Sequence, residues 1–338
     1  MKIQQDISLK DYNTFGIDAR AKFFIEVNST NELREALQLN GYPKIFVISG
    51  GSNMLITKDI DALVLYINIK GIEVSTQDDD TITLKIMAGE NWHKLVLWTL
   101  KKGYGGLENM SLIPGNTGTA PIQNIGAYGV ELKDTFVRCE AMKIDDQAIK
   151  SFNKKDCKFG YRDSYFKNEG KGKYIIVSVT LRLTKRNHRI NRSYGAIESE
   201  LNKKNVDRPT ITDISNAVIS IRKSKLPDPA KLGNSGSFFK NPVINQTKFD
   251  TFTKAYPDAP YYKVSSNAYK IPAGWLIEQC GFKGKRFGDA GVHEHQALVL
   301  VNHGKATGIE ILNLAQKIIK SVRDKFSITI HPEVNIIK

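Results

Sequence analysis

The sequence predicts an α+β protein with more than one domain. Its 338 residues are long enough for two or three domains. Segments with strand-like alternation and segments with helical spacing follow one another, and no G-x-G-x-x-G fingerprint of a Rossmann fold is present. The chain is organised around residues 111–129, SLIPGNTGTAPIQNIGAYG, where glycines and prolines crowd together. We therefore expect several mixed layers arranged about one irregular central loop.

The chain opens with a small βαββ unit, whose elements are expected at residues 22–28, 29–39, 44–49 and 62–67. Ser29 or Thr30 is the expected helix N-cap, with Glu32 in the first turn. The strand at 44–49 runs into Gly50-Gly51-Ser52-Asn53. Backbone N–H groups gathered at such a junction can hold a pyrophosphate, although a plain hairpin turn would explain the four residues equally well.

The later elements follow the same patterns. Alternation predicts strands at residues 81–87, 137–144, 174–183, 297–302, 328–330 and 334–337. Helical spacing predicts helices at residues 92–101, 213–224, 274–280 and 307–326. Gly103 should end the first of these helices, and Thr212 should be the N-cap of the second. The polar stretch 185–193 is expected to be a linker.

The central loop suits a flat, uncharged ligand. Glycine permits positive φ angles and close approach of another body, and proline prevents a helix from running through. The polar residues between them are short donors and acceptors: Asn116, Thr117, Thr119, Gln123 and Asn124. Such a backbone fits a flavin ring, although an ordinary glycine-rich turn is the alternative.

Composition bounds the class of protein. The formal net charge is +14, which is compatible either with nucleic-acid binding or with a site for several anionic small molecules. The Lys and Arg residues are scattered, so the second explanation is preferred. No apolar run approaches a membrane span, and the three cysteines form no metal-ligand pattern. We expect a cytoplasmic protein.

Nine short motifs carry a resemblance to a known family. Besides the central loop they are NTFGID (13–18), GGSNML (50–55), AGENWH (88–93), FGYRDS (159–164), KLPDP (225–229), GSFFKNP (236–242), AGWLIE (273–278) and PEV (332–334). Their content and order resemble the UDP-N-acetylenolpyruvoylglucosamine reductase family, in its longer form with a tyrosine loop. The resemblance covers nearly the whole chain.

The resemblance implies a fold and a domain plan. A two-subdomain FAD-binding unit of the vanillyl-alcohol-oxidase/PCMH type would be joined to an α+β substrate-binding domain. The implied boundaries are 1–69 for FAD-binding subdomain 1, 70–215 for subdomain 2 and 216–326 for the substrate-binding domain. The C-terminal strand 327–338 would return near the first subdomain.

The resemblance also implies the cofactors and the reaction. NADPH would reduce non-covalently bound FAD, and the enolpyruvyl ether of UDP-N-acetylglucosamine-enolpyruvate would then be reduced to UDP-N-acetylmuramate for peptidoglycan synthesis. The residues implied to bind FAD are Gly50, Gly51, Ser52, Asn53, Met54, Leu55, Ile113, Pro114, Gly115, Gly118, Thr119, Ile122, Asn124, Gly126 and Tyr128. A monomer is expected, without nucleic-acid or membrane partners.

The chemistry demands three groups, and the motifs offer one for each. Hydride addition to the vinyl carbon leaves carbanion character next to a carboxylate, which requires positive charge, a hydrogen-bonding acid and a proton donor. Arg162 fits the cation because guanidinium grips a carboxylate through two hydrogen bonds. Glu333 fits the acid partner, and Ser237 fits the proton donor for a strongly basic carbanion.

The substrate-binding residues implied by the resemblance are Tyr161, Tyr194, Lys225, Asn241, Tyr262, Lys270 and Gln296. Residues 258–263 resemble the mobile tyrosine loop, but either Tyr261 or Tyr262 could be the one that closes over substrate. The chain departs from the family pattern at Asn116 and Ala120, where flavin contacts would differ. Residues 185–209 match the family poorly apart from Tyr194-Gly195.

Two other functions are compatible with parts of the sequence. A different FAD-dependent oxidase or dehydrogenase would share the flavin unit, and a basic nucleic-acid-binding module would have no flavin. Ser237 lacks the G-x-S-x-G elbow of a hydrolase nucleophile. His293 and His295 lack the H-E-x-x-H spacing and would point apart on a helix, so no catalytic metal is expected.

Overall fold

The computed structural model describes residues 1–42 and 44–338, which divide into two compact units. Unit 1 comprises Met1–Ile7, Ala21–Gly50 and Asp61–Ser224. Unit 2 comprises Ser8–Arg20, Gly51–Ile60 and Lys225–Lys338. Two short N-terminal segments therefore fold with the C-terminal third of the chain. The expected division into three domains stays a prediction.

The first sheet of unit 1 contains the opening βαββ unit and one further strand. Its order is β1 (Gln4–Ser8), β2 (Arg20–Val27), β5 (Ile60–Ile67) and β3 (Ile45–Ile48), with β3 and β5 parallel. Helix α1 (Thr30–Leu37) is capped by Ser29, one of the two expected caps, whose Oγ accepts a hydrogen bond from the Glu32 N–H at 3.1 Å. Leu33 of α1 packs into the core beneath this sheet.

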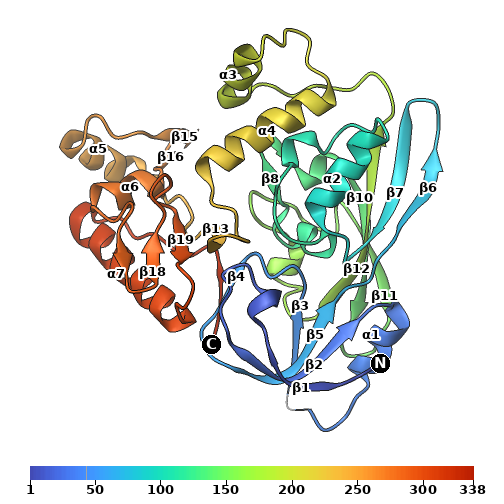
Figure 1. Ribbon diagram of the computed structural model, residues 1–338. Helices are drawn as coiled ribbons and strands as arrows, with labels where there is room; N and C mark the ends of the chain where they lie inside the picture. The colour runs from blue at the N-terminus through green and yellow to red at the C-terminus, as the bar shows by residue number, and fades with distance from the viewer. Residues whose placement is uncertain (43) are drawn as a thin grey trace. The chain divides into compact units, whose positions relative to one another are not determined.

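The second sheet of unit 1 is antiparallel throughout. Figure 1 shows its long strands, in the order β11 (Ile149–Asn153), β10 (Phe136–Lys143), β12 (Tyr174–Thr184), β7 (Thr81–Met87) and β6 (Ile72–Gln77). In β7 the even-numbered residues Ile82, Leu84 and Ile86 are buried, as the alternation predicts. Helix α2 (Trp92–Lys101) has the predicted bounds, and Gly103 after it has a left-handed φ of 74°.

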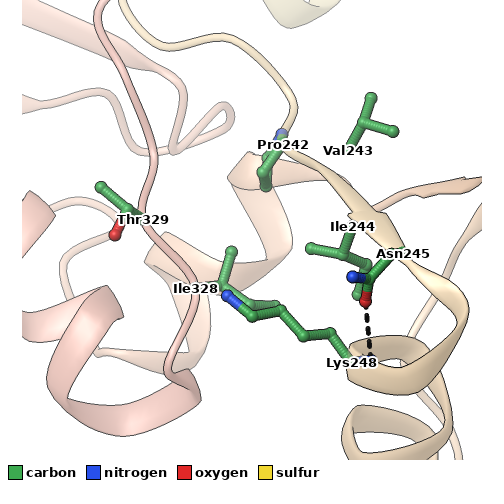
Figure 2. A pocket seen from close by; sticks show the side chains of 7 residues that line it. All are labelled: Pro242, Val243, Ile244, Asn245, Lys248, Ile328 and Thr329. Carbon is green, nitrogen blue, oxygen red and sulfur yellow. Dashed lines mark hydrogen bonds between the residues drawn. The ribbon is translucent and has the colours of Figure 1, made fainter.

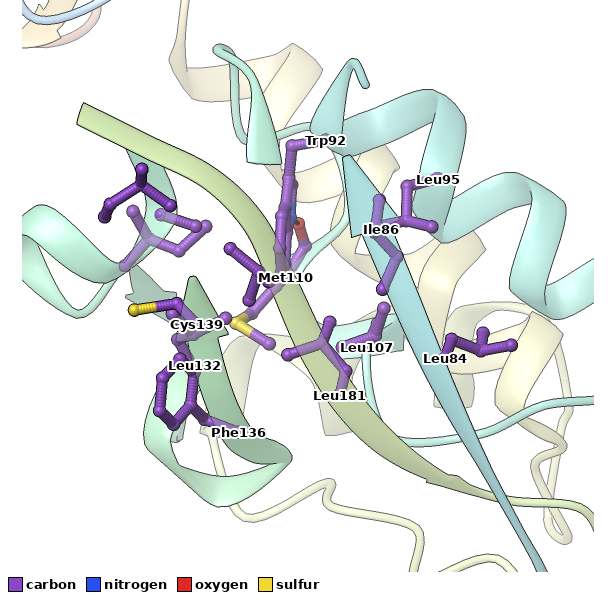
Figure 3. Packing of buried hydrophobic residues seen from close by; sticks show 14 of the residues in the cluster. Leu84, Ile86, Trp92, Leu95, Leu107, Met110, Leu132, Phe136, Cys139 and Leu181 are labelled. Carbon is purple, nitrogen blue, oxygen red and sulfur yellow. Dashed lines mark hydrogen bonds between the residues drawn. The ribbon is translucent and has the colours of Figure 1, made fainter. Parts of the chain in front are cut away.

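A hydrophobic core of unit 1 lies where this sheet meets α2 and the central loop. Figure 3 shows Trp92 and Leu95 of α2 together with side chains from the sheet and the loop segments, among them Ile86, Met110, Leu132, Phe136 and Leu181. The remaining elements here are short: η2 (Glu108–Met110), η3 (Thr117–Gln123), β8 (Gly126–Ala127), β9 (Val130–Glu131), η4 (Leu132–Asp134) and η5 (Tyr165–Lys167).

Unit 1 ends in two helices. Helix α3 (Gly195–Lys203) had no predicted counterpart, and α4 (Ile211–Lys225) begins earlier than expected. The predicted N-cap Thr212 is wrong, because it lies inside α4. The Thr210 hydroxyl accepts from the Asp213 N–H at 3.2 Å instead. This register buries Ile211 and Ile214, and the burial decides which threonine caps the helix.

Unit 2 is built on a four-stranded sheet with the order β13 (Gly233–Ser237), β19 (Val299–Asn302), β18 (Ala290–Val292) and β17 (Arg286–Phe287). Its helices include α6 (Ala273–Gln279) and α7 (Gly308–Phe326). Thr307 caps α7 in a capping box: the Thr307 hydroxyl accepts from the Glu310 N–H at 3.2 Å, and the Glu310 carboxylate accepts from the Thr307 N–H at 2.7 Å.

A three-stranded sheet and a parallel strand pair complete unit 2. The sheet has the order β14 (Val243–Asn245), β16 (Ala268–Lys270) and β15 (Tyr262–Ser265), with α5 (Gln246–Ala255) following β14. The C-terminal β20 (Asn335–Ile337) pairs in parallel with β4 (Met54–Ile56). The predicted strand 328–330 is wrong. Ile328 and Ile330 are buried there in irregular backbone. A short η1 (Lys10–Tyr12) follows β1.

Candidate active site

The central loop is held tightly against the end of β7 and the start of α2. The Trp92 N–H donates to the Gly115 carbonyl at 3.0 Å, and the Gly118 N–H donates to the Ala88 carbonyl at 2.9 Å. A Cβ on Gly118 would lie 2.5 Å from the Ala88 Cβ. This glycine is therefore required by the protein's own packing, and the loop has a fixed backbone shape.

Two of the predicted FAD-binding segments meet within unit 1. A Cβ on Gly50 would lie 2.6 Å from the Gly115 Cα, so the two backbones are in direct contact. Beside them, Asn116 Nδ2 donates to Ser49 Oγ at 3.1 Å. Glycine at position 50 is what allows the turn after β3 to approach the central loop this closely.

Helix α4 flanks the central loop and brings a residue that the sequence analysis missed. Ser215 Oγ lies 2.8 Å from Ser111 Oγ in a buried contact. Two helical turns later, the Arg222 guanidinium lies close to the Tyr128 hydroxyl. Burial lowers the pKa of Arg222, and the nearby Arg162 guanidinium lowers it further. The sequence context of Arg222, IRKSK, resembles a solvated helix end. Arg222 can therefore be recognised as a site residue only from the burial of this face of α4 in the structure.

His93 fixes the entry to the central loop. Its Nδ1 accepts a hydrogen bond from the Leu112 N–H at 2.9 Å, and Leu112 itself has a left-handed φ of 59°. Burial lowers the pKa of His93, and the positive charges of Arg222 and Lys223 lower it further. The ring is therefore neutral at pH 7, which is the state needed for Nδ1 to accept.

Arg162 lies in a strained tight turn before η5. Its φ is +55°, a conformation that side chains other than glycine adopt at a cost of about 1–2 kcal/mol. Gly160 and Asp163 exchange backbone hydrogen bonds of 3.0 and 3.3 Å, which close the turn. The guanidinium carbon lies 5.9 Å from the centre of the Tyr161 ring. Strain of this kind at a candidate catalytic residue is consistent with a functional constraint.

Three predicted site residues of unit 1 present exposed apolar surface. Tyr161 is 70% exposed, Tyr194 is 51% exposed and Ile122 is 39% exposed. Tyr194 packs edge-on against Tyr128 with ring centres 5.2 Å apart, so the poorly matching segment does reach the central loop. Exposed aromatic and aliphatic groups beside a rigid polar loop are the surface that a flat ring system needs.

In unit 2 the predicted proton donor and acid lie on neighbouring backbone segments. Ser237 ends β13, and the next residue, Phe238, accepts a hydrogen bond at its carbonyl from the Glu333 N–H at 2.8 Å. The Ser237 side chain is exposed and Glu333 is half-buried. The chain therefore holds a hydroxyl and a carboxyl group in one region of unit 2.

Asn241 and Gln296 meet the beginning of α6. Asn241 Oδ1 accepts from the Ala273 N–H at 2.9 Å, and a Cβ on Gly274 would lie 3.1 Å from Gln296 Oε1. The first turn of a helix leaves backbone N–H groups without intrahelical partners, and Asn241 satisfies one of them. Its amide nitrogen is not used by that contact.

The structure distinguishes the two candidate loop tyrosines. Tyr261 packs against Phe249 with ring centres 4.7 Å apart and against Tyr269 at 6.1 Å. Tyr262 is 61% exposed, and it pairs across the sheet with Lys270, whose Nζ lies 6.0 Å from the Tyr262 ring centre. Tyr261 thus belongs to an aromatic cluster, and Tyr262 is presented outward with a cation beside it.

The remaining predicted residues lie as follows. Met54 and Leu55 are buried in β4, so only their backbone groups are offered to a ligand. Gly51 has a φ of +57°, and Ser52 and Asn53 follow it into β4. In the central loop, Ile113, Pro114 and Gly126 flank η3. Thr119 lies within η3, and its Oγ1 donates to the Asn116 carbonyl at 2.7 Å. Lys225 is exposed at the end of α4.

The structure describes no metal site. Within residues 1–42 and 44–338, no group of three or more His, Cys, Asp or Glu side chains is arranged to hold a metal ion. His293 and His295 do not lie on a helix as supposed. They follow β18, and their ring centres are 5.5 Å apart.

A shallow depression in unit 2 (Figure 2) is lined by Pro242, Val243, Ile244, Asn245, Lys248, Ile328 and Thr329, with a volume of about 390 Å³. It contains none of the predicted site residues.

The residues of unit 1 fit an FAD group. Arg222 Nε is buried and has no hydrogen-bond partner within the part of the chain that the structure describes. A buried guanidinium N–H of this kind calls for an acceptor from a ligand. It lies beside Tyr128 of the central loop. The exposed side chains of Tyr161, Tyr194 and Ile122 form an apolar rim in the same unit. A flavin carbonyl would satisfy the orphan donor, and the rim would cover a flat ring.

Comparison with known proteins identifies relatives over the whole chain. A family model described as "FAD binding domain" matches residues 21–150, and one described as "UDP-N-acetylenolpyruvoylglucosamine reductase, C-terminal domain" matches residues 228–337. Proteins named UDP-N-acetylenolpyruvoylglucosamine reductase share 59% identity in Flavobacterium johnsoniae, 48% in Amoebophilus asiaticus and 45% in Pseudomonas aeruginosa. Each of these alignments covers at least 99% of both chains.

A solved structure shares the fold. The UDP-N-acetylenolpyruvylglucosamine reductase of Thermus caldophilus superposes with a TM-score of 0.70 and 23% identity, covering 100% of both chains. None of the helices in the described residues is long and apolar enough to span a membrane.

Proposed function

The chain belongs to the UDP-N-acetylenolpyruvoylglucosamine reductase family, and on that premise we propose that it reduces UDP-N-acetylglucosamine-enolpyruvate to UDP-N-acetylmuramate with NADPH through bound FAD. The product is a precursor of peptidoglycan. We further propose that the enzyme acts in the cytoplasm as a monomer.

One observation carries the assignment of chemistry. Unit 2 fixes Ser237 beside the backbone of Glu333 through the Glu333 N–H···O=C Phe238 bond of 2.8 Å. A hydroxyl and a carboxyl group held on neighbouring backbone segments match the demand for a proton donor and a hydrogen-bonding acid.

The side chains divide the work as follows. When bound, FAD supplies the hydride that NADPH donates to it. Arg162 binds the substrate carboxylate through its planar guanidinium and stabilises the negative charge that develops there. Glu333 shares a hydrogen bond with the resulting enol-like group. Ser237 delivers a proton from Oγ to the basic carbon, which completes the lactyl ether.

The polar groups of unit 2 would hold the nucleotide sugar. Lys270 and Lys225 offer positive charge to a diphosphate. Asn241 has an amide nitrogen available for a sugar hydroxyl or acetamido oxygen. Tyr262 stands exposed next to Lys270, which suits a side chain that closes over bound substrate.

An absorption experiment tests the proposal. The purified protein should show a flavin spectrum that bleaches with NADPH under anaerobic conditions and recovers when UDP-N-acetylglucosamine-enolpyruvate is added. UDP-N-acetylglucosamine, which has no vinyl group, is the control and should give no recovery. A protein without flavin, or a reduced flavin that the enolpyruvyl substrate cannot reoxidise, would contradict the assignment.

A further inference from the structure

Arg162 is connected to the central loop through its backbone. Ser164 Oγ donates to the Ile122 carbonyl at 2.6 Å, and Asn124 Nδ2 donates to the Gly160 carbonyl at 3.0 Å. These two bonds run in opposite directions between the loop and the turn that bears Arg162. They fix the turn on both sides of Arg162.

A third bond holds the strained residue itself. Lys167 Nζ donates to the Arg162 carbonyl at 3.0 Å. This contact comes from η5, one turn further along the chain. Three side-chain hydrogen bonds therefore hold the turn around the left-handed Arg162. Asn124 donates to the Gly160 carbonyl, Ser164 donates to the Ile122 carbonyl, and Lys167 donates to the Arg162 carbonyl.

The Asn124 side chain, which the resemblance places among the FAD-binding residues, uses both ends of its amide inside unit 1. It is fully buried, and its own φ of 44° is also left-handed. Its Nδ2 donates to the Gly160 carbonyl, and its Oδ1 accepts from the Lys133 N–H at 3.0 Å. Both ends of the amide are thus engaged within unit 1. Ser164 is 1% exposed, and its Oγ also accepts from the Phe166 N–H at 3.2 Å.

We propose that Asn124 and Ser164 are positioning residues that set the place of the Arg162 guanidinium relative to the central loop. This inference rests on the proposed function, because it gives Arg162 the task of binding the substrate carboxylate. A misplacement of about 1 Å can slow a reaction by about 10²-fold. The flavin-binding backbone would remain in place, so the effect should fall on the half-reaction with substrate.

Two variants test the proposal. Asn124→Asp keeps the size, the acceptor for Lys133 and tolerance of a left-handed backbone, but places an oxygen against the Gly160 carbonyl. Ser164→Ala removes the other bond. Asn205→Asp is the matched control, because Asn205 is exposed and has a φ of 54°. Each protein is prepared with FAD, and both half-reactions are followed anaerobically by stopped flow.

We expect both variants to keep their FAD and to be reduced by NADPH within about threefold of the wild-type rate. Reoxidation by the enolpyruvyl substrate should slow by roughly 10–100-fold, and Asn205→Asp should change neither rate. When each change is added to Arg162→Ala, the further loss should be below about threefold, because residues that act through one group are not additive.

Several results would overturn the inference. Loss of FAD from Asn124→Asp would make Asn124 a flavin ligand, and equal slowing of both half-reactions would indicate general damage. Full additivity with Arg162→Ala, or normal reoxidation in Arg162→Ala alone, would also refute it. If Asn124→Asp fails to fold, Ser164→Ala decides. Failure of the proposed function is distinguishable, because the wild-type protein itself would then not turn over the enolpyruvyl substrate.

Discussion

Replacing Gly118 by alanine tests whether the shape of the central loop is set by contact with the end of β7. The new Cβ would lie 2.5 Å from the Ala88 Cβ and 3.0 Å from the Ala88 Cα, where ordinary contacts are 3.4–4 Å. Ala88 cannot retreat, because it is buried and its N–H donates to the Val177 carbonyl at 2.9 Å. The loop must therefore move outward by roughly 1 Å.

The magnitude follows from overpacking. An inserted methyl group that forces such a shift costs about 1–3 kcal/mol. Unit 1 has about 200 residues, a size at which 1 kcal/mol shifts Tm by about 2–4 °C. We expect Tm of the apoprotein to fall by roughly 2–12 °C. The displaced loop should also weaken FAD binding by at least about tenfold, which corresponds to about 1.4 kcal/mol.

Thermal unfolding of the apoprotein and a fluorescence titration with FAD measure the two effects. Gly195→Ala is the control, because nothing lies within 4 Å of its Cβ position and its φ is not in the left-handed range. Gly195 begins α3, so alanine there should be neutral or slightly stabilising. If Gly118→Ala kept both the wild-type Tm and the wild-type FAD affinity, the argument that this glycine is required by packing would be refuted.

Three further predictions concern single side chains. Ser237→Ala should leave flavin reduction by NADPH within about threefold and slow reoxidation by substrate by roughly 10²–10⁴-fold, as expected for loss of a proton donor. Tyr262→Ala should raise KM for the substrate by about tenfold with little change in Tm, whereas Tyr261→Ala should cost about 1–2 kcal/mol of stability through lost ring contacts. The pKa of His93 is lowered from 6.5 on folding, so its stabilising effect is complete above pH 6.5 and is lost as pH falls through the lower folded pKa. Thermal unfolding of His93→Gln should therefore show a flatter pH dependence than the wild type below pH 6.5.

Each of these has an outcome that would contradict it. Equal slowing of both half-reactions would remove Ser237 from the proton-donor role. Interchanged phenotypes for the two tyrosines would mean that the outward side chain is not the one that meets substrate. Parallel pH curves for His93→Gln and the wild type would show that protonation of this ring does not limit stability.

The sequence predicted best those helices whose ends are set by capping residues close by in the chain. Ser29, one of the two caps expected for α1, is the residue that caps it, and α7 begins directly after Thr307, where the sequence predicts the start of a helix. The sequence analysis placed the N-cap of α4 at Thr212 instead of Thr210, because threonine is a competent cap at either position. Burial of Ile211 and Ile214 against the rest of unit 1 decides between them, and this is tertiary information.

Pairing between distant segments left no local trace. β4 has three residues and takes its partner, β20, from the other end of the chain. Arg222 was missed for a similar reason, since a guanidinium in a charged helix end is usually solvated. The motif resemblance did indicate Asn124, but only the structure shows that both ends of its amide are used within the protein.

The interleaving of the chain between the two units has a consequence for biosynthesis. Residues 8–20 and 51–60 leave the ribosome early, yet the rest of the unit to which they belong begins at Lys225 and ends at Lys338. At 5–20 residues per second, β4 waits roughly 15–55 s for β20 to be translated. During that interval the apolar Met-Leu-Ile segment lacks the strand with which it pairs in the folded protein. A stalled or prematurely terminated translation product would expose the same strand permanently, so quality control could recognise incomplete chains by it.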